Sequence, residues 1–382
     1  MYTLETNSFR NAFYQLCKDV REQGSKVESR NGNTLELHPA LIRITNPLDR
    51  CTLIPSRGNN PFATLAETIW VWSGHSNIDW LLPFLPRAKD YSDNPNDANA
   101  SWRAGYGRRL RNLLIGENEN WVLGACVDQI RWIYDELKKD KANRRAVATI
   151  WIPSEECTVK ESLDRPCTNW LHFLIRDNKL DMEVVMRAND LVWGFGSINV
   201  FEFTVLQEIL AKLLDVRIGN YYHFVSSFHL YENMYSKVEE ILTNKCEIKK
   251  WPNFSFDLTD NNKSFNEVDA NLRLIYDIID INRKMDNVRV ENVLIHWRDN
   301  PASNWNIKNK DIQDIIKLLL FYLWVMGRKG LTMAKCIEML KILNIRKTDL
   351  YVDCMFWLLK KLKEMDVNYI SKVEEMVMKG EL

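Results

Sequence analysis

Two kinds of hydrophobic periodicity alternate along the first 262 residues of the chain. Apolar residues spaced three or four positions apart predict helices at residues 1–25, 62–74, 128–139, 200–214 and 230–242. Segments rich in β-branched and aromatic residues predict strands at 34–44, 146–152, 170–175, 180–186 and 221–229. The region is therefore expected to mix helices and strands, although the pattern by itself does not specify how they are arranged.

Two segments between these elements are expected to be irregular. Residues 88–108 are polar and rich in turn-forming residues, which predicts a surface loop. The tripeptide Asp177-Asn178-Lys179 separates two predicted strands. It predicts a hairpin turn, because Asp and Asn tolerate the backbone conformations that tight turns require.

Beyond residue 262 the pattern becomes almost entirely helical. Helices are predicted at 268–283, 312–327, 332–343 and 350–365, while residues 288–297 fit either a helix or an extended segment. We therefore divide the chain into a mixed domain at residues 1–262 and a helical extension at residues 263–382.

The charge balance limits the partners that the chain can have. Lys and Arg together number 51, as do Asp and Glu, so the net charge is zero. Proteins that bind the nucleic-acid backbone usually carry an excess of positive charge, so we expect no nucleic-acid partner. The longest apolar run, residues 315–326, is too short to span a membrane. With no secretory leader pattern at the start, a cytoplasmic location is expected.

The cysteines carry no metal-binding or disulfide signature. Eight of them lie far apart without a CxxC motif, at Cys17, Cys51, Cys126, Cys157, Cys167, Cys246, Cys336 and Cys354. This spacing predicts neither a metal site nor a disulfide framework. Each cysteine is then either a small core residue or a reactive thiol.

Cys167 is the candidate nucleophile among them. It follows Pro166 at the start of a predicted strand. A nucleophilic thiol needs a lowered pKa, which nearby cations provide, and Arg165 and Arg187 are the candidates. The alternative is a buried structural cysteine, which is the commoner role of an isolated cysteine.

The segment after Arg187 offers groups suited to a small polar ligand. The Arg187 guanidinium can bind a phosphate through two hydrogen bonds, and Asp190 can accept a hydrogen bond from a ring N–H; a surface ion pair is the alternative. Asn199 either caps the following helix or pairs with the N3–H and O4 edge of uracil, because a carboxamide is both donor and acceptor. Gly194 permits close approach of the backbone.

A pair of adjacent arginines, Arg144 and Arg145, precedes a predicted strand. Two neighbouring guanidinium groups can hold a phosphate dianion. The alternative is an ordinary solvated face.

Taken together and in order, these motifs resemble the thymidylate synthase family, which includes the pyrimidine nucleotide hydroxymethylases. The resemblance runs from about residue 27 to 235. It is carried by Arg30-Asn31-Gly32, Ala66–Gly74 with Glu67, Gly105–Arg111 with Tyr106, Arg144-Arg145, Pro166-Cys167, Arg187–Asp190 with Gly194, Asn199-Val200-Phe201 and His229-Leu230-Tyr231.

The resemblance implies a three-layer α+β fold with a large mixed sheet, to which the all-helical C-terminal extension is added. It also implies a homodimer formed by stacking of the sheets. The active sites would be completed across that interface, with Arg144 and Arg145 reaching the partner's phosphate.

The resemblance implies the following roles in the active site. Cys167 would add to carbon 6 of the pyrimidine and make carbon 5 nucleophilic. Asn199 would read the pyrimidine edge, Glu67 would move protons through water, and Tyr106 would help remove the carbon 5 proton. The remaining implied roles are phosphate binding by Arg30 and Arg187, sugar binding by His229 and Tyr231, and binding of the cofactor 5,10-methylenetetrahydrofolate by Asp190 and Gly194.

The chain departs from the family pattern at several positions. Thr168 stands where the nucleophile is usually followed by His, and Ala188 stands where a Ser is usual. Asn199 matches the pyrimidine-reading Asn only if one residue is inserted before it, since a rigid register would place Ile198 there. Residues 263–382 extend past the usual end, and the apolar tail that closes over folate is not identifiable.

Three functions remain open from the sequence. The first is methylation of dUMP to dTMP. The second is hydroxymethylation of dUMP or dCMP, in which water replaces hydride at the last step. Asn199 favours uracil here, because the cytosine enzymes place an Asp at that position. The third is a catalytically silent nucleotide-binding regulator.

Overall fold

The computed structural model describes residues 1–97, 99–114, 126–245, 248, 250–259, 263–299 and 307–363. Contacts between backbone positions divide the chain into two compact units. The first unit is Met1–Arg50 with Glu67–Tyr235, and the second is Cys51–Ala66 with Ser236–Leu382. The proposed domain boundary at residue 262 does not coincide with this division and stays a prediction.

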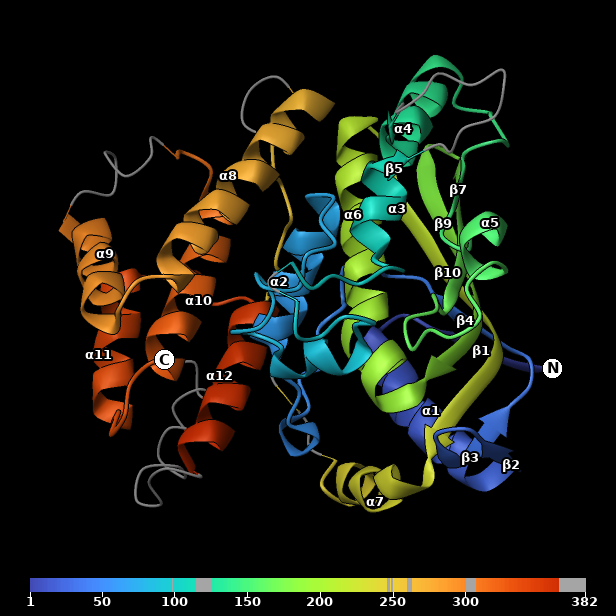
Figure 1. Ribbon diagram of the computed structural model, residues 1–382, viewed down its shortest axis with the longest axis horizontal. Helices are drawn as coiled ribbons and strands as arrows, with labels where there is room; N and C mark the ends of the chain where they lie inside the picture. Colours follow the sequence, from blue (N-terminus) through green and yellow to red (C-terminus); the bar gives the residue numbers. More distant parts are fainter. Residues whose placement is uncertain are drawn as a thin grey trace. The chain divides into compact units, whose positions relative to one another are not determined.

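A mixed β-sheet forms the centre of the first unit (Figure 1). Its described strands are β1 (Tyr2–Thr6), β2 (Ser25–Ser29), β3 (Gly32–Leu37), β4 (Ala40–Ile44), β7 (Val147–Thr149), β8 (Thr168–Arg176), β9 (Lys179–Asp190) and β10 (Arg217–Tyr231). They follow the order β1-β4-β10-β9-β8-β7, while β3 also pairs with β10 and β2 with β3. The β1–β4 and β9–β10 pairs are parallel and the others antiparallel. The predicted α+β class with a large mixed sheet is confirmed.

Two helices, α1 (Phe9–Gln23) and α6 (Val200–Leu213), pack on this sheet. The first is amphipathic and is capped by Ser8, whose side chain accepts from the amide of Asn11. The second is buried on nearly every side, which explains why most of its residues are apolar, and its buried residues also include Glu202, Gln207 and Glu208. The helix predicted at residues 1–25 begins later than expected. Residues 2–6 instead pair with β4, and this pairing overrides their local propensity.

Two sequence predictions in this unit need correction. The strand predicted at 34–44 is two strands, β3 and β4, separated by a cis peptide bond between His38 and Pro39. Residues 88–108 are not simply a surface loop. They include a 3-10 turn at Pro86–Tyr91 and the start of α3 (Tyr106–Arg111), and Ala88 and Ala100 pack with Ile78 in a small core. Most described residues from 89 to 99 are exposed, as predicted, while Ala88 and Ala100 anchor the segment to this core.

Other local predictions hold. The helix α4 (Gln129–Lys139) begins after Asp128, whose side chain accepts from the amide of Arg131. The hairpin turn between β8 and β9 places Asp177 and Asn178 at positive φ, 51° and 56°. The first unit also contains α5 (Pro153–Glu156) and a small pair of strands, β5 (Leu113–Leu114) and β6 (Cys126–Val127).

The second unit is helical in the part that the structure describes. Its helices are α7 (Tyr235–Thr243), α8 (Phe265–Arg283), α9 (Asn287–Asp299), α10 (Lys310–Met326), α11 (Met333–Leu343) and α12 (Asp349–Lys363). The helix α2 (Pro61–Trp72) begins in this unit and ends in the first. The segment at 288–297, which fitted either a helix or an extended segment, is part of the helix α9. Both α8 and α9 pack against α10. The last residues of the helix predicted at 350–365 lie outside the described range.

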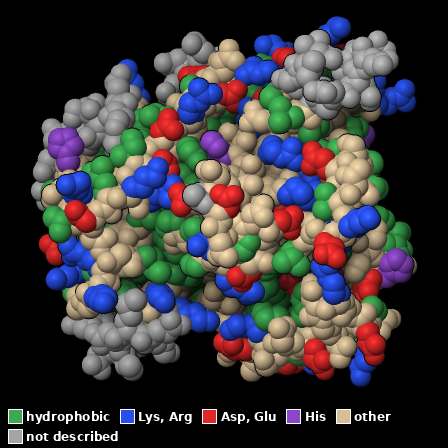
Figure 2. All heavy atoms as spheres, in the orientation of Figure 1, with side chains coloured by type: hydrophobic (Ala, Val, Ile, Leu, Met, Phe, Trp, Pro, Cys, Tyr) green, Lys and Arg blue, Asp and Glu red, His purple; other side chains and the backbone are tan. Residues whose placement is uncertain are grey.

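The surface mixes both signs of charge. On the face drawn in Figure 2, Lys and Arg side chains are interspersed with Asp and Glu, which agrees with the equal numbers of the two kinds. Within the described ranges no helix is long and apolar enough to cross a membrane.

Candidate active site

A cavity of about 430 Å³ lies in the first unit, where the loops and the ends of several elements meet. Of the twelve residues that the sequence nominates, ten line it: Arg30, Glu67, Tyr106, Cys167, Arg187, Asp190, Gly194, Asn199, His229 and Tyr231. They come from the β2–β3 turn, α2, α3, β9, β10 and the segments flanking β8 and α6. Residues far apart in sequence are thus brought to one concave surface, as a small-molecule site requires.

Arg144 and Arg145 are the two that the structure does not bring to this cavity. Both are exposed and precede β7 at the end of the strand order. The backbone carbonyl of Arg144 accepts a hydrogen bond from Nε2 of His172, at 3.2 Å. Their proposed role in a partner's site remains a prediction.

Cys167 and Arg187 lie together on adjacent strand ends. The Arg187 amide donates to the Cys167 carbonyl at 2.9 Å, and Nη2 of Arg187 lies 3.8 Å from Sγ of Cys167. Nε of Arg187 donates to the Pro166 carbonyl at 2.9 Å. These backbone contacts fix the guanidinium beside the thiol while part of it still faces the cavity.

The predicted net lowering of the thiol pKa is not what the structure shows. Burial raises the pKa of Cys167, and the Arg187 guanidinium opposes this rise without reversing it. The charges of Asp164 and Asp190 raise it further. The free site therefore favours the thiol, and Arg187 is the group that favours the thiolate.

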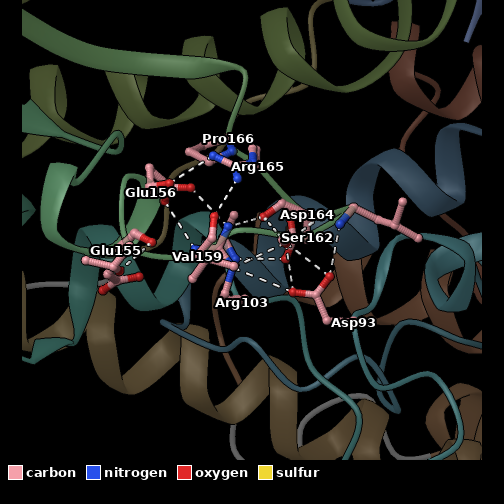
Figure 3. A network of polar contacts seen from close by, with 12 residues as sticks. Asp93, Arg103, Glu155, Glu156, Val159, Ser162, Asp164, Arg165 and Pro166 are labelled. Atoms are coloured by element: carbon pink, nitrogen blue, oxygen red, sulfur yellow. Dashed lines mark hydrogen bonds and ion pairs between the residues drawn. The ribbon is translucent and has the colours of Figure 1, made fainter. Parts of the chain in front are cut away.

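Arg165 has a different role from the one its sequence position indicates. Its Nη1 donates to the Glu156 carbonyl at 2.8 Å and its Nη2 to the Val159 carbonyl at 2.6 Å. The guanidinium thus closes the loop that leads to Cys167 (Figure 3). It does not count among the causes that lower the Cys167 pKa.

A cluster of charged side chains, centred on the fully buried pair Arg109 and Glu156, contacts the same loop. Arg103 donates to both carboxylate oxygens of Glu156, at 3.0 and 3.4 Å, and to the Asp164 carbonyl at 2.5 Å (Figure 3). Arg109 is fully buried, and its Nη2 lies 2.5 Å from Oε1 of Glu156. Burial disfavours ionisation of Glu156, but the two guanidinium groups keep its pKa below its usual range. The cluster fixes the backbone just before the nucleophile.

Thr168, which replaces the usual His, is bonded to Tyr106. Both its amide and its hydroxyl donate to the Tyr106 hydroxyl oxygen, at 3.2 and 3.1 Å. The Tyr106 ring stacks on Phe203, with centroids 6.4 Å apart. Burial and the neighbouring Cys167 raise the Tyr106 pKa. The phenol is therefore protonated and held close to the nucleophile.

Two carboxyl groups, Glu67 and Glu202, line the cavity together. Burial raises the pKa of Glu67 to about 7. Burial, and secondarily the charge of Glu67, raises the pKa of Glu202 well above its ordinary value. Glu202 is 1% exposed, and its Oε1 has no hydrogen-bond partner in the described part of the chain. Near neutral pH the pair can therefore hold and exchange a proton.

Sequence reasoning missed Glu202, although a signal was present. It lies three residues after Asn199 in a helix that begins with the mostly apolar run Val200–Val205, so both side chains face the same side. An acidic residue on the buried face of such a helix requires a reason. Asp164, Trp70 and Trp102 also line the cavity and were not nominated.

A π-helix leads to Asn199. Residues Leu191–Asn199 form wide turns between β9 and α6. A π-helix is rare, is often found at functional sites, and holds more residues per turn than an α-helix, so this segment has room for the inserted residue that the resemblance requires. Asn199 lines the cavity, whereas Ile198 is not among the lining residues. The placement fits the register that includes the insertion.

Behind Asn199 lies a row of buried polar side chains. Nδ2 of Asn189 donates to Oδ1 of Asn199 at 2.8 Å. Oδ1 of Asn189 is 3.2 Å from Nε2 of His223, and Nδ1 of His223 is 2.8 Å from the Tyr221 hydroxyl. Burial lowers the His223 pKa to about 3, so the imidazole is neutral.

The comparisons with known proteins agree with this geometry. The sequence model of thymidylate synthase matches residues 11–280, and the chain therefore belongs to the thymidylate synthase family, a family of one-carbon transferases.

Among similar proteins is the deoxyuridylate hydroxymethyltransferase of Bacillus phage SP01, 32% identical over 63% of this chain and 62% of that protein. That of Delftia phage PhiW-14 is 34% identical over 60% of this chain and 62% of the relative. The thymidylate synthase of Bacillus licheniformis is 27% identical over 44% of this chain and 56% of the relative. The chain thus matches less than two thirds of the length of these relatives.

Proposed function

We propose that this chain is a folate-dependent deoxyuridylate hydroxymethyltransferase that acts through a covalent adduct of Cys167 with dUMP. The sequence alone ranked methylation to dTMP first. Similarity to phage deoxyuridylate hydroxymethyltransferases, and the second carboxyl group in the cavity, reverse that preference.

Covalent addition begins with Cys167. Its sulfur forms a bond to carbon 6 of the uracil, and the electron pair of the carbon 5–carbon 6 bond moves toward O4. Nη2 of Arg187, 3.8 Å from the sulfur, favours the thiolate that reacts. Asn199 supports the charge that develops on O4, and this makes carbon 5 nucleophilic.

Glu67 and Tyr106 are the side chains that would transfer protons to and from the substrate. Glu67, with a pKa near 7, carries a proton in much of the protein at neutral pH and can supply it toward O4. Tyr106 lies beside Thr168 and Cys167, where it can help to remove the proton of carbon 5. Its high pKa means that it acts as a hydrogen-bond relay between water and the substrate.

The residues present fit a folate. Oδ2 of Asp190 is a buried oxygen with no hydrogen-bond partner in the described residues, although Asp190 borders the cavity. Such an oxygen suits a ring N–H of a pterin, and Trp102 and Tyr91 supply aromatic surface nearby. When bound, 5,10-methylenetetrahydrofolate supplies one carbon at the oxidation level of formaldehyde. Asp190 and Gly194 would hold it.

The observation that carries the choice of hydroxymethyl over methyl is Glu202. Glu202 lines the cavity together with Cys167 and Glu67, and its Oε1 has no hydrogen-bond partner in the described residues. A buried carboxylate oxygen in a polar cavity is a site for an ordered water. Loss of the carbon 5 proton would let the bond between the new carbon and the folate nitrogen break, with tetrahydrofolate as the leaving group. Glu202 in its ionised form would then take a proton from the water as the water oxygen bonds to the new carbon, and the displaced electron pair would move toward O4. The electron pair then returns through carbon 5 and expels the Cys167 thiolate.

A product assay tests the proposal. The protein is incubated with methylenetetrahydrofolate and, separately, dUMP, dCMP and their ribonucleotides. The nucleotide is identified by mass spectrometry while the absorbance of dihydrofolate is followed. We expect a hydroxymethyl product from dUMP without dihydrofolate. A methyl product with dihydrofolate would make the chain a thymidylate synthase, and no product with any nucleotide would favour the silent regulator.

The sheet of the first unit has one face on which a second copy of the chain would fit. The sheet face opposite α1 and α6 carries partly exposed residues of large apolar type, including Trp170, Val185 and Phe224. Stacking of two such sheets would bury them, and this supports the homodimer expected from the family. A cytoplasmic location and the absence of a nucleic-acid partner stay predictions.

A further inference from the structure

An asparagine that reads a pyrimidine edge can face it in two ways. With its oxygen opposite N3 and its nitrogen opposite the 4-substituent, the carboxamide matches uracil. When the amide is rotated by half a turn, the same side chain matches cytosine. Asn199 alone therefore does not choose a base, and something must hold its amide in one orientation.

The side chains behind Asn199 provide such a constraint. Tyr221, His223 and Asn189, here called the amide relay, join it by hydrogen bonds of 2.8, 3.2 and 2.8 Å. Tyr221 and His223 are fully buried, and Asn189 is 3% exposed. With the Asn189 nitrogen facing Asn199, only the Asn199 oxygen can accept from it, since the rotated amide would oppose two donors.

The direction of the amide relay follows from the orientation of the Asn189 amide, whose nitrogen faces Asn199 and whose oxygen faces His223. Oδ1 of Asn189 has no hydrogen to give, so Nε2 of His223 must be the donor. Nδ1 is then the acceptor, and the Tyr221 hydroxyl must donate to it. Burial raises the Tyr221 pKa and lowers the His223 pKa, so the phenol keeps its proton and the imidazole carries only one. Each donor therefore finds one acceptor along the row.

Packing around the amide relay fixes its shape. Phe195 from the π-helix meets the His223 ring edge-on, with centroids 5.1 Å apart. A Cβ at Gly194 would lie 2.4 Å from Nδ2 of Asn189 and 3.0 Å from Oδ1 of Asn199. Any side chain at position 194 would therefore displace the two amides. The absence of a side chain at Gly194 is thus needed for the amide relay as well as for the shape of the cavity.

We propose that Tyr221, His223 and Asn189 are positioning residues that lock the Asn199 carboxamide in one orientation and so restrict the enzyme to one pyrimidine. The inference rests on the proposed function for the identity of that base, uracil. Tyr221 and His223 do not line the cavity, so they act through Asn189 and Asn199.

Reversing the amide relay is the sharpest test. In Asn189→Asp the carboxylate accepts from His223 but cannot donate to Asn199, so the Asn199 amide must turn to present its nitrogen. Affinities for dUMP and dCMP are measured by titration calorimetry without folate, which separates base choice from turnover. We expect wild type to prefer dUMP by at least about 100-fold, and Asn189→Asp to reduce that preference by at least about tenfold.

A second, more conservative variant keeps the inference testable if Asn189→Asp does not fold. Tyr221→Phe removes only the terminal hydroxyl and frees the imidazole tautomer, so we expect the preference to fall by about threefold. Tyr134→Phe is the matched control. Its hydroxyl accepts from Lys138 on the same helix, and Tyr134 does not line the cavity, so the ratio should stay at the wild-type value.

The outcomes separate the two claims. Binding of dUMP with an unchanged dUMP-to-dCMP ratio in both relay variants would overturn the inference and leave the proposed function standing. Equal binding of dUMP and dCMP by wild type would also overturn it, because the locked amide would then not discriminate. Failure of wild type to bind any pyrimidine nucleotide would overturn the proposed function, and the inference with it.

Discussion

Around the cavity of the first unit, carboxyl, amide and imidazole side chains are buried against one another, whereas α10 of the second unit is buried through aliphatic and aromatic side chains. Glu202, His223 and Asn199 represent the first kind. Ile315, Leu319 and Trp324 represent the second, each at most 1% exposed. Burying a polar group costs free energy unless it is paired, whereas burying an apolar one stabilises the fold.

The ion pairs of the two units differ in the same way. In the first unit, Arg109 and Glu156 are both fully buried beneath the loop that carries the nucleophile. In the second, Arg346 joins Asp311 and Asp314 but is itself 41% exposed. The first unit thus buries both partners of an ion pair where the pair orders a reactive group, whereas in the second unit the buried carboxylates Asp311 and Asp314 share a cation that stays at the surface.

The largest expected effect is the loss of turnover, without loss of dUMP binding, when Cys167 is replaced. Cys167→Ala removes the group that forms the adduct, so turnover should fall by at least about 10⁴-fold. Binding of dUMP, measured by calorimetry, should change by less than about threefold, because the remaining lining residues are intact. Substantial residual turnover would show that another group is the nucleophile.

The next largest effects are losses of unfolding free energy, which we compare between a buried charged residue of the first unit and a buried apolar residue of the second. Arg109→Ala leaves Glu156 with one cation fewer in a fully buried place, so unfolding free energy should fall by about 3–5 kcal/mol. Leu319→Ala in α10 should cost about 2–5 kcal/mol through the cavity it leaves.

Both variants are unfolded with denaturant at several pH values. The loss in Arg109→Ala should shrink at acid pH, where Glu156 is protonated, whereas the loss in Leu319→Ala should not change. A pH-independent loss in Arg109→Ala would mean that its effect comes from packing.

A smaller effect concerns the proposed dimer. Arg144 is exposed and outside the cavity of its own chain. If it completes the partner's phosphate site, Arg144→Ala should weaken dUMP binding by about tenfold. Deoxyuridine lacks the phosphate and serves as the control, since its binding should not change. Unchanged dUMP affinity would show that this arginine does not reach a phosphate.

The smallest effect is the pH dependence contributed by Glu67. Its pKa rises from 4.5 to about 7 on folding, so its contribution to stability is fully present below pH 4.5 and is lost as the pH rises through 7. Glu67→Gln cannot titrate, and its melting temperature should therefore decline less over that range. Glu202 titrates in both proteins, but removal of the Glu67 charge also changes its pKa, so the difference between the two curves reports Glu67 together with its effect on Glu202. Parallel curves would contradict the raised pKa.

Much of the site could be predicted from short motifs, because each motif keeps its residues on one strand end or turn. Cys167, Arg187 and Asn199 were nominated in this way and line one cavity. The inserted residue before Asn199 is what the resemblance to the family implies and stays a prediction, to which the π-helix at Leu191–Asn199 lends support.

The amide relay could not be predicted from the sequence, because it depends on parallel pairing of strands. His223 lies opposite Val184 and Phe228 opposite Asn189 in the register of β9 and β10. Local periodicity does not specify which strands pair or in which direction. The same limit explains β1, whose residues 2–6 read as part of a helix but pair with β4.

The most direct test of the account is the origin of the oxygen in the product. The reaction of dUMP with methylenetetrahydrofolate is run in water enriched in heavy oxygen, and the nucleotide is analysed by mass spectrometry. We predict a hydroxymethyl group that carries the heavy isotope, made much more slowly by Glu202→Gln, which cannot accept the proton of water. A methyl group, or a hydroxymethyl group formed equally fast by Glu202→Gln, would contradict the account.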